Sequence, residues 1–297
     1  MKHTDYIITG PTASGKSDFA HNLAQTVGGA IINCDSVQIY RGIENISASP
    51  LAGLHEFNGQ IDGVPYAMFS IVDLDSQLSV VEYLNMARAE YERLHAAGYP
   101  VIFVGGTGYY INAIVNGISP MPDIADDVRT RARDMVRSDI NAARRMLGND
   151  FPHTDPQRIS RALEVLMQTG RQISEFQSLP RTGGFLPSAV RILINPPADV
   201  LSARIAARIP HMLDGGATTE AQRIIARNQN PNRAIGAAQL CAYLRGEKSK
   251  DECISEWITK TRQYAKRQRT WFRTQFDADI IINRVPTDAD MDTVLSH

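Results

Sequence analysis

A glycine-rich segment near the amino terminus has the residue types and spacing of a phosphate-binding loop. It reads GPTASGKS and matches the pattern G-x-x-x-x-G-K-[ST] between a predicted strand and a predicted helix. Its residues are Gly10, Pro11, Thr12, Ala13, Ser14, Gly15, Lys16 and Ser17. In such a loop the backbone N–H groups converge on phosphate oxygens, the lysine neutralises phosphate charge and the serine hydroxyl binds Mg²⁺. The segment therefore predicts a nucleotide or diphosphate site, with ATP among the candidate ligands, Lys16 as a catalytic residue and Ser17 as the Mg²⁺ ligand.

The motifs that would assign the loop to a common class of nucleotide hydrolase are missing from the sequence. ATPases carry a Walker-B acid at the end of an apolar strand, but the strand predicted over residues 101–104 runs into Gly105-Gly106-Thr107-Gly108. No N/T-K-x-D pattern, which reads guanine, follows a predicted strand. Both a motor ATPase and a GTPase switch are disfavoured.

A carboxylate lies at the end of the second predicted strand. The apolar run Ala30–Cys34 leads into DSVQIY, residues 35–40. Because the carboxyl ends of parallel strands meet at one edge of a sheet, Asp35 is expected near the phosphate loop. Asp35 is a candidate base for an acceptor substrate, and a helix cap or a ligand of Mg²⁺-bound water would also use a carboxylate there.

The elements that would position these residues alternate between strands and helices. Apolar runs predict strands at 6–9, 30–34, 101–104, 190–194 and 279–282, and helical periodicity predicts helices at 18–26, 80–97, 198–214, 219–227 and 251–274. Residues 119–186 contain no strand signal and predict polar helices at 126–147 and 155–177. The expected fold is α/β: a P-loop-type parallel-sheet core of residues 1–118 and 187–297 with a helical insertion of residues 119–186.

Composition excludes several other classes of protein. Among 297 residues, 31 lysines and arginines face 32 acids, and the net charge of −1 argues against a wholly basic nucleic-acid coat protein. The three cysteines form no C-x-x-C pair, so neither a disulfide framework nor a zinc site is indicated. Every apolar run is shorter than the roughly 20 residues that span a bilayer, and the first residues lack the apolar stretch of a secretion signal. We expect a cytoplasmic protein without a membrane partner.

Six segments taken together closely resemble the tRNA dimethylallyltransferases, also called tRNA isopentenyltransferases, the IPP transferase family. They are GPTASGKS, DSVQIY, VGGTGYY, DPQRISRALEV, RAIGAAQL and TRQYAKRQRTWFR. The resemblance covers nearly the whole chain. It implies transfer of a dimethylallyl group from dimethylallyl diphosphate to N6 of adenosine 37, next to the anticodon, in tRNAs that read codons beginning with U.

The implied reaction suits the residues already singled out. The phosphate loop and Mg²⁺ would hold the departing diphosphate, and Asp35 would accept a proton as N6 attacks the allylic carbon. By the resemblance, Thr107 is also catalytic and lies near the donor oxygen or the acceptor base. The target adenosine must leave its stacked loop, and Gln38 offers an adenine edge both an amide donor and an acceptor.

The resemblance also implies contacts with the tRNA anticodon stem-loop. The implied contact residues are Asp35, Ser36, Val37, Gln38, Thr107, Arg129, Gln157, Arg158, Ile159, Ser160 and Arg161. The sequence departs from the family at Ile46–Pro50, where a G-T-A-[KR]-P element is common and this chain reads ISASP. The expected oligomeric state is a monomer.

Two groups of lysine and arginine residues could bind a polyanion. Arg262, Lys266, Arg269 and Arg273 follow one face of the predicted carboxyl-terminal helix. We call these four residues the cationic stripe; a solubilising surface helix is the alternative explanation, and the interleaved aromatic residues are expected in the core. The second group, in the insertion, consists of Arg129, Arg131, Arg133 and Arg137.

Three other functions remain as alternatives at this point. A small-molecule or nucleoside kinase shares the phosphate loop and the acid after the second strand. A prenyltransferase for free adenine nucleotides shares the chemistry but does not need the helical insertion. A tRNA-binding or RNA-binding module with a vestigial phosphate loop would need neither catalytic group.

Overall fold

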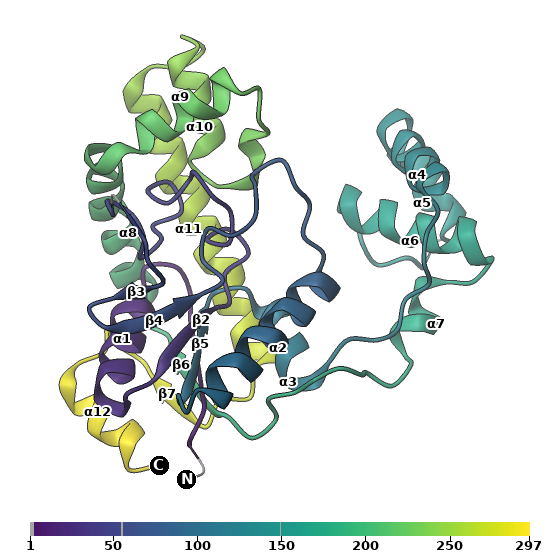
Figure 1. The fold of residues 1–297 in the computed structure, drawn as a ribbon. Helices are drawn as coiled ribbons and strands as arrows, with labels where there is room; N and C mark the ends of the chain where they lie inside the picture. Colours follow the sequence, from purple (N-terminus) through teal and green to yellow (C-terminus); the bar gives the residue numbers. More distant parts are fainter. Residues whose placement is uncertain (1–2, 55, 149) are drawn as a thin grey trace. The chain divides into compact units, whose positions relative to one another are not determined.

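The computed structural model describes residues 3–54, 56–148 and 150–297. Its central element is a seven-stranded sheet in the order β3-β4-β2-β5-β1-β6-β7 (Figure 1). Among these strands, β3 and β4 pair in antiparallel fashion, and the other neighbours are parallel. The strands are β1 (Tyr6–Thr9), β2 (Ala30–Asn33), β3 (Gln60–Ile61), β4 (Val64–Ala67), β5 (Val101–Gly105), β6 (Val190–Ile194) and β7 (Ile280–Ile282). The predicted α/β fold with a parallel sheet is confirmed.

The helices around this sheet begin and end where capping residues allow. Ser79 and Ser249 each form a capping box, which starts α2 and the long helix α11. The helices are α1 (Lys16–Val27), α2 (Val80–Ala96), α3 (Gly108–Asn116), α8 (Ala198–Met212), α9 (Thr218–Ala226), α10 (Ala237–Leu244), α11 (Lys250–Gln275) and α12 (Asp288–Leu295), with the short helical turns η1 (Leu213–Ala217) and η2 (Pro231–Arg233). The described part of the chain has no helix with the length and apolar character that a bilayer crossing requires.

The chain divides into two compact units, residues 1–115 with 185–297, and residues 116–184. The predicted insertion spans residues 119–186. The second unit starts three residues before residue 119 and ends two residues before residue 186. It contains α4 (Asp126–Ser138), α5 (Ile140–Met146), α6 (Pro156–Thr169) and α7 (Ile173–Gln177). Its core contains Ala132, Ala143, Ile159 and Leu163.

Two helices predicted in this unit are each divided in the structure. Asp139 ends the first because its carboxylate accepts hydrogen bonds from the backbone of Asn141 and Ala142, which caps α5. Gly170 ends α6 in a left-handed conformation with φ 72°. The prediction of continuous helices over 126–147 and 155–177 is wrong. The helical periodicity of the sequence continues across both caps, so it does not reveal where the first helix of each pair ends.

Candidate active site

The phosphate loop joins β1 to α1, and glycine is required at both of its ends. A Cβ on Gly10 would lie 2.1 Å from the carbonyl oxygen of Ile194 on β6. Gly15 begins α1 with φ 91°, a left-handed conformation that side chains disfavour. The loop can therefore pass close to the end of β6 and lead directly into α1.

Two polar side chains of this loop, Ser14 and Lys16, have few or no hydrogen-bond partners among the described residues. The hydroxyl of Ser14 is buried and has no hydrogen-bond partner among the described residues. The ammonium of Lys16 donates to the carbonyl of Pro11 at 3.3 Å, and burial lowers the pKa of Lys16 to about 8. Because a buried polar group without a partner costs free energy, a bound anion would stabilise this arrangement.

Two arginines on α8 complete the cationic side of the site. Arg208 donates to the hydroxyl of Thr12 at 2.9 Å, and Arg204 donates to the carbonyl of Ala13 at 2.8 Å. Burial, together with the neighbouring Arg204, lowers the pKa of Arg208, and its Nε is buried without a partner in the described ranges. Sequence reasoning missed both; the only signal was two cations four residues apart on one helix face.

Gln268 on α11 ties the phosphate loop to the loop after β5. Its Oε1 accepts from the backbone N–H of Thr12 at 2.8 Å, and its Nε2 donates to the carbonyl of Gly106 at 2.8 Å. The side chain is buried, so both hydrogen bonds are protected from water. Gln268 was not predicted as a site residue, although it lies within a segment that carries the family resemblance.

Asp35 starts a tight turn at the end of β2. Its Oδ1 accepts from the backbone N–H groups of Val37 at 2.9 Å and Gln38 at 3.4 Å. The side chain of Asn33 accepts from the N–H of Asp35 at 2.8 Å. One carboxylate oxygen therefore holds the turn, and the other can accept a proton or a hydrogen bond from a ligand.

Thr107 joins this turn to the loop after β5. Its hydroxyl accepts from the backbone N–H of Ser36 at 2.9 Å and donates to the Ser36 hydroxyl at 3.1 Å. Burial and the charge of Asp35 raise the pKa of Tyr264, which also interacts with the Thr107 hydroxyl. Three predicted residues, Asp35, Ser36 and Thr107, are thus brought together.

Gln38 is fixed in one orientation by backbone carbonyls. Its Nε2 donates to the carbonyl of Ala48 at 2.9 Å and to that of Ser47 at 3.3 Å. Carbonyls only accept hydrogen bonds, so these two partners identify the amide nitrogen of Gln38 and orient it toward the turn. This arrangement engages the nitrogen of Gln38 and leaves its oxygen for a ligand, whereas the prediction from sequence assigns Gln38 both a donor and an acceptor role.

The phosphate loop, the Asp35 turn and α8 line one cavity of about 680 Å³. Its cationic side contains Lys16, Arg204 and Arg208, and its apolar lining is Val37, Ile46, Ile209, Met212, Ile235 and Trp257. Thr12–Asp18 and Asp35–Gln38 both contribute to the lining. Tyr264, which we expected in the core, lies at this cavity, whereas Phe272 is buried as expected.

Mg²⁺ is the metal that the donor set of this cavity could hold. Mg²⁺ binds oxygen ligands, keeps several waters and commonly needs only one or two protein ligands beside substrate phosphates. The hydroxyl of Ser17 and the carboxylate of Asp18 line the cavity beside the phosphate loop. Within the described ranges, no group of three His, Cys, Asp or Glu side chains could hold a metal by itself. The residues present fit a cation that binds together with a phosphate ligand.

The predicted tRNA contacts of the insertion all belong to the second unit. Gln157, Arg129 and Arg158 are exposed on α4 and α6. The side chains of Ile159 and Ser160 are instead buried, with exposed fractions of 0% and 9%, so they hold the unit together. Arg161 donates to the buried carboxylate of Glu164 at 3.1 Å.

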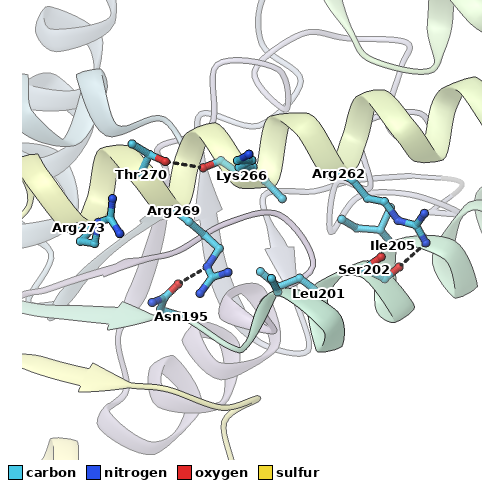
Figure 2. Close-up of a pocket in the computed structure, with 11 residues that line it drawn as sticks. Asn195, Leu201, Ser202, Ile205, Arg262, Lys266, Arg269, Thr270 and Arg273 are labelled. Atoms are coloured by element: carbon cyan, nitrogen blue, oxygen red, sulfur yellow. Dashed lines mark hydrogen bonds between the residues drawn. The ribbon is translucent and has the colours of Figure 1, made fainter.

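The cationic stripe lines a second groove, of about 460 Å³, between α8 and α11. Figure 2 shows Arg269 donating to the side chain of Asn195 and Arg262 donating to the backbone of Ser202, at 3.1 Å and 3.4 Å. Lys266 and Arg273 line the same groove. The four cations therefore share one surface, as a polyanion site requires.

Comparisons with known proteins point to one family. The sequence profile described as IPP transferase matches residues 38–275, and that described as isopentenyl transferase matches residues 3–59. A tRNA dimethylallyltransferase of Rhizobium etli is 37% identical over an alignment of 286 residues, and the match covers 91% of this chain and 94% of the relative. One of Zymomonas mobilis is 36% identical and covers 93% of this chain and 89% of the relative.

A solved structure agrees with this result. The crystal structure of the full-length tRNA isopentenylpyrophosphate transferase of Bacillus halodurans is 28% identical, with a TM-score of 0.70. The match covers 99% of this chain and 95% of that one. The resemblance carried by the six sequence segments is therefore confirmed, and the chain belongs to the IPP transferase family.

Proposed function

We propose that this protein transfers a dimethylallyl group from dimethylallyl diphosphate to tRNA. The observation that carries the proposal is one cavity with a cationic phosphate loop, an apolar wall and the carboxylate of Asp35. An allylic diphosphate has an anionic end and a hydrocarbon end, which this lining matches. Relatives named tRNA dimethylallyltransferase at 36–37% identity support the same reaction.

The acceptor in this proposal is N6 of adenosine 37, extruded from the anticodon loop of tRNAs that read codons beginning with U. N6 forms a bond to C1 of the donor, the bond between C1 and the diphosphate oxygen breaks, and N6 loses one proton. Asp35 accepts that proton, and diphosphate leaves with the electron pair of the broken bond. The product is N6-dimethylallyladenosine.

The phosphate loop stabilises the charge that grows on the leaving group. Lys16, Arg208 and the loop N–H groups bind the diphosphate oxygens, and the hydroxyl of Ser14 supplies a further donor. Mg²⁺, held by Ser17, would neutralise part of the remaining negative charge. Thr107 keeps the Asp35 turn in register with the loop after β5 through its two hydrogen bonds to Ser36.

The remaining properties of the proposed enzyme follow from its substrate. A tRNA acceptor implies a reaction in the cytoplasm, and a monomer remains our expectation. The exposed arginines of the insertion and the cationic stripe would contact phosphates of the anticodon stem-loop, because phosphate contacts position a nucleic acid without reading its bases.

Label transfer tests the proposed function directly. Purified protein with Mg²⁺ and radiolabelled dimethylallyl diphosphate should label an anticodon stem-loop with adenosines at positions 36 to 38, and nucleoside analysis should find the label only at position 37. A parallel reaction with γ-labelled ATP and nucleosides should give no phosphoryl transfer. Folded protein that labels no RNA, or that phosphorylates a nucleoside, would contradict the proposal.

The affinity for the donor should depend on the protonation of Lys16. Burial lowers its pKa from 10.5 to about 8, so the free enzyme loses the ammonium charge as the pH rises through about 8. We therefore expect the KM for dimethylallyl diphosphate to increase above this pH, while a lysine of ordinary pKa would remain charged. Steady-state rates between pH 7 and pH 10 check this, and Lys16→Arg, which stays charged, should abolish the increase. The same rise in Lys16→Arg would assign it to another group.

The cationic stripe should contribute to the salt dependence of tRNA binding. Replacing Arg262, Lys266, Arg269 and Arg273 with glutamine should reduce the slope of log K against log[salt] by about 0.7–0.9 for each phosphate that the variant no longer neutralises. The matched control replaces exposed cations outside the groove, namely Arg41, Arg93, Arg227 and Lys250. An equal slope in wild type and the stripe variant would mean that this helix face only aids solubility.

A further inference from the structure

The buried carboxylate of Glu220 on α9 lies outside the residues that the proposed reaction uses. It is 1% exposed, although an isolated buried carboxylate is costly. Its Oε1 accepts from both the backbone N–H and the side-chain amide of Asn45, and its Oε2 accepts from the backbone N–H of Ile46, each at 2.8 Å. Three donors therefore offset part of the cost of burying this carboxylate, and all three come from the turn at residues 43–49.

This turn overlaps Ile46–Pro50, the segment where the sequence lacks the G-T-A-[KR]-P element common in the family. It is closed by backbone hydrogen bonds from Ser47 to Ile43, from Ala48 to Asn45 and from Ser49 to Glu44, at 2.8, 3.1 and 2.8 Å. Ala48 has φ 49°, which is unfavourable for a residue with a side chain. A strained turn persists only where surrounding residues hold it in place. Glu220 does this through hydrogen bonds to Asn45 and Ile46, which lie 175 and 174 residues away in the chain.

The two carbonyls at the end of this turn determine what Gln38 presents to the cavity. The carbonyls of Ser47 and Ala48 both accept from the amide nitrogen of Gln38 and so hold it against the turn. Gln38, Ile46, Ser47 and Ala48 all line the cavity that contains Asp35. The carboxamide oxygen of Gln38 is thus the atom available to a base that enters beside Asp35.

We propose that Glu220 is a positioning residue for the acceptor base, because it fixes the turn that makes Gln38 present only an oxygen to the cavity. This inference rests on the proposed function. The exocyclic amino group of adenine has two hydrogens, so Asp35 can accept one and Gln38 the other. A base with a carbonyl at this position, such as hypoxanthine or guanine, would bring a third oxygen toward two acceptors. Gln38, held through Glu220, would select a purine with an amino group at C6 over one with a carbonyl there.

Binding to stem-loops that differ at one atom tests this inference. Wild-type protein should bind an anticodon stem-loop with adenosine at position 37 about tenfold or more tightly than the same RNA with inosine, as expected for leaving a buried acceptor unpaired. Gln38→Leu, which removes the oxygen, should reduce this ratio toward one. Glu220→Gln, which cannot accept from all three donors of the turn, should also reduce the ratio and raise the KM for the stem-loop. The KM for dimethylallyl diphosphate should stay within about twofold in both variants.

Matched controls separate positioning from a general loss of structure. Gln222→Leu on the same helix and the exposed Glu247→Gln should keep the wild-type ratio. Asn45→Ala, which removes one of the three donors to Glu220, should give an intermediate ratio. If Gln38→Leu keeps the wild-type ratio, the inference is overturned; if Glu220→Gln alone keeps it, Glu220 has no positioning role. Wild-type protein that labels no tRNA would instead refute the proposed function. The two failures can be told apart, because label transfer tests the reaction and the binding ratios test the selection of the base.

Discussion

Asp35→Asn is expected to lower the single-turnover rate of dimethylallyl transfer by about 10²–10⁴-fold, the usual contribution of a general base. Asparagine keeps an oxygen for the backbone N–H groups of Val37 and Gln38, so the turn after β2 should survive. What is lost is the carboxylate that accepts the N6 proton. The affinity for the stem-loop should change by less than about tenfold, because backbone phosphate contacts supply most of it.

Rapid mixing of enzyme and labelled donor with excess stem-loop measures this rate, and filter binding measures the affinity. The control is Asp75→Asn, an exposed aspartate whose partner, Gln229, can donate to an asparagine oxygen equally well. It should react at the wild-type rate. If Asp35→Asn also retains that rate, another group removes the proton and our assignment of the base is wrong.

Lys16→Met is expected to reduce kcat/KM for dimethylallyl diphosphate by about 10²–10³-fold, as for other groups that stabilise charge on a leaving group. Methionine keeps the apolar length of the side chain and removes the ammonium. Both the binding of the donor and the departure of diphosphate should suffer, while the affinity for the stem-loop stays the same.

Steady-state kinetics with varied donor concentration check this prediction, and inorganic diphosphate as an inhibitor reports on the same contact. Lys250→Met, at the exposed start of α11, is the matched control and should behave as wild type. Unchanged inhibition by diphosphate in Lys16→Met would show that the leaving group binds somewhere else than on the phosphate loop.

The parts of the site that could be predicted from sequence are those built from consecutive residues. The phosphate loop and the Asp35–Gln38 turn each carry their donors and acceptors within a few positions, so their residue types already define their geometry. The buried strands β1, β5 and β6 were predictable because a parallel sheet buries both faces of a strand and gives a short apolar run. Sheet topology then brings Asp35 to the phosphate loop.

The parts that could not be predicted depend on partners far apart in the chain. Gln268 meets Thr12 across 256 residues, Arg208 meets the same threonine across 196, and Glu220 meets Asn45 across 175. The local amino-acid pattern of a helix does not indicate which loop its buried polar residue will contact. The short hairpin of β3 and β4 was missed for another reason: β3 has only two residues, and Pro65 interrupts the apolar run of β4.

In the proposed reaction the donor diphosphate and the acceptor adenine meet in the cavity between the phosphate loop and Asp35. A crystal structure with a nonreactive thio-analogue of dimethylallyl diphosphate, Mg²⁺ and an anticodon stem-loop tests it most directly. We expect the diphosphate on residues 10–17 and adenine N6 within about 2.6–3.2 Å of the Asp35 carboxylate. A donor bound away from residues 10–17, or an adenine whose N6 points away from Asp35, would contradict it.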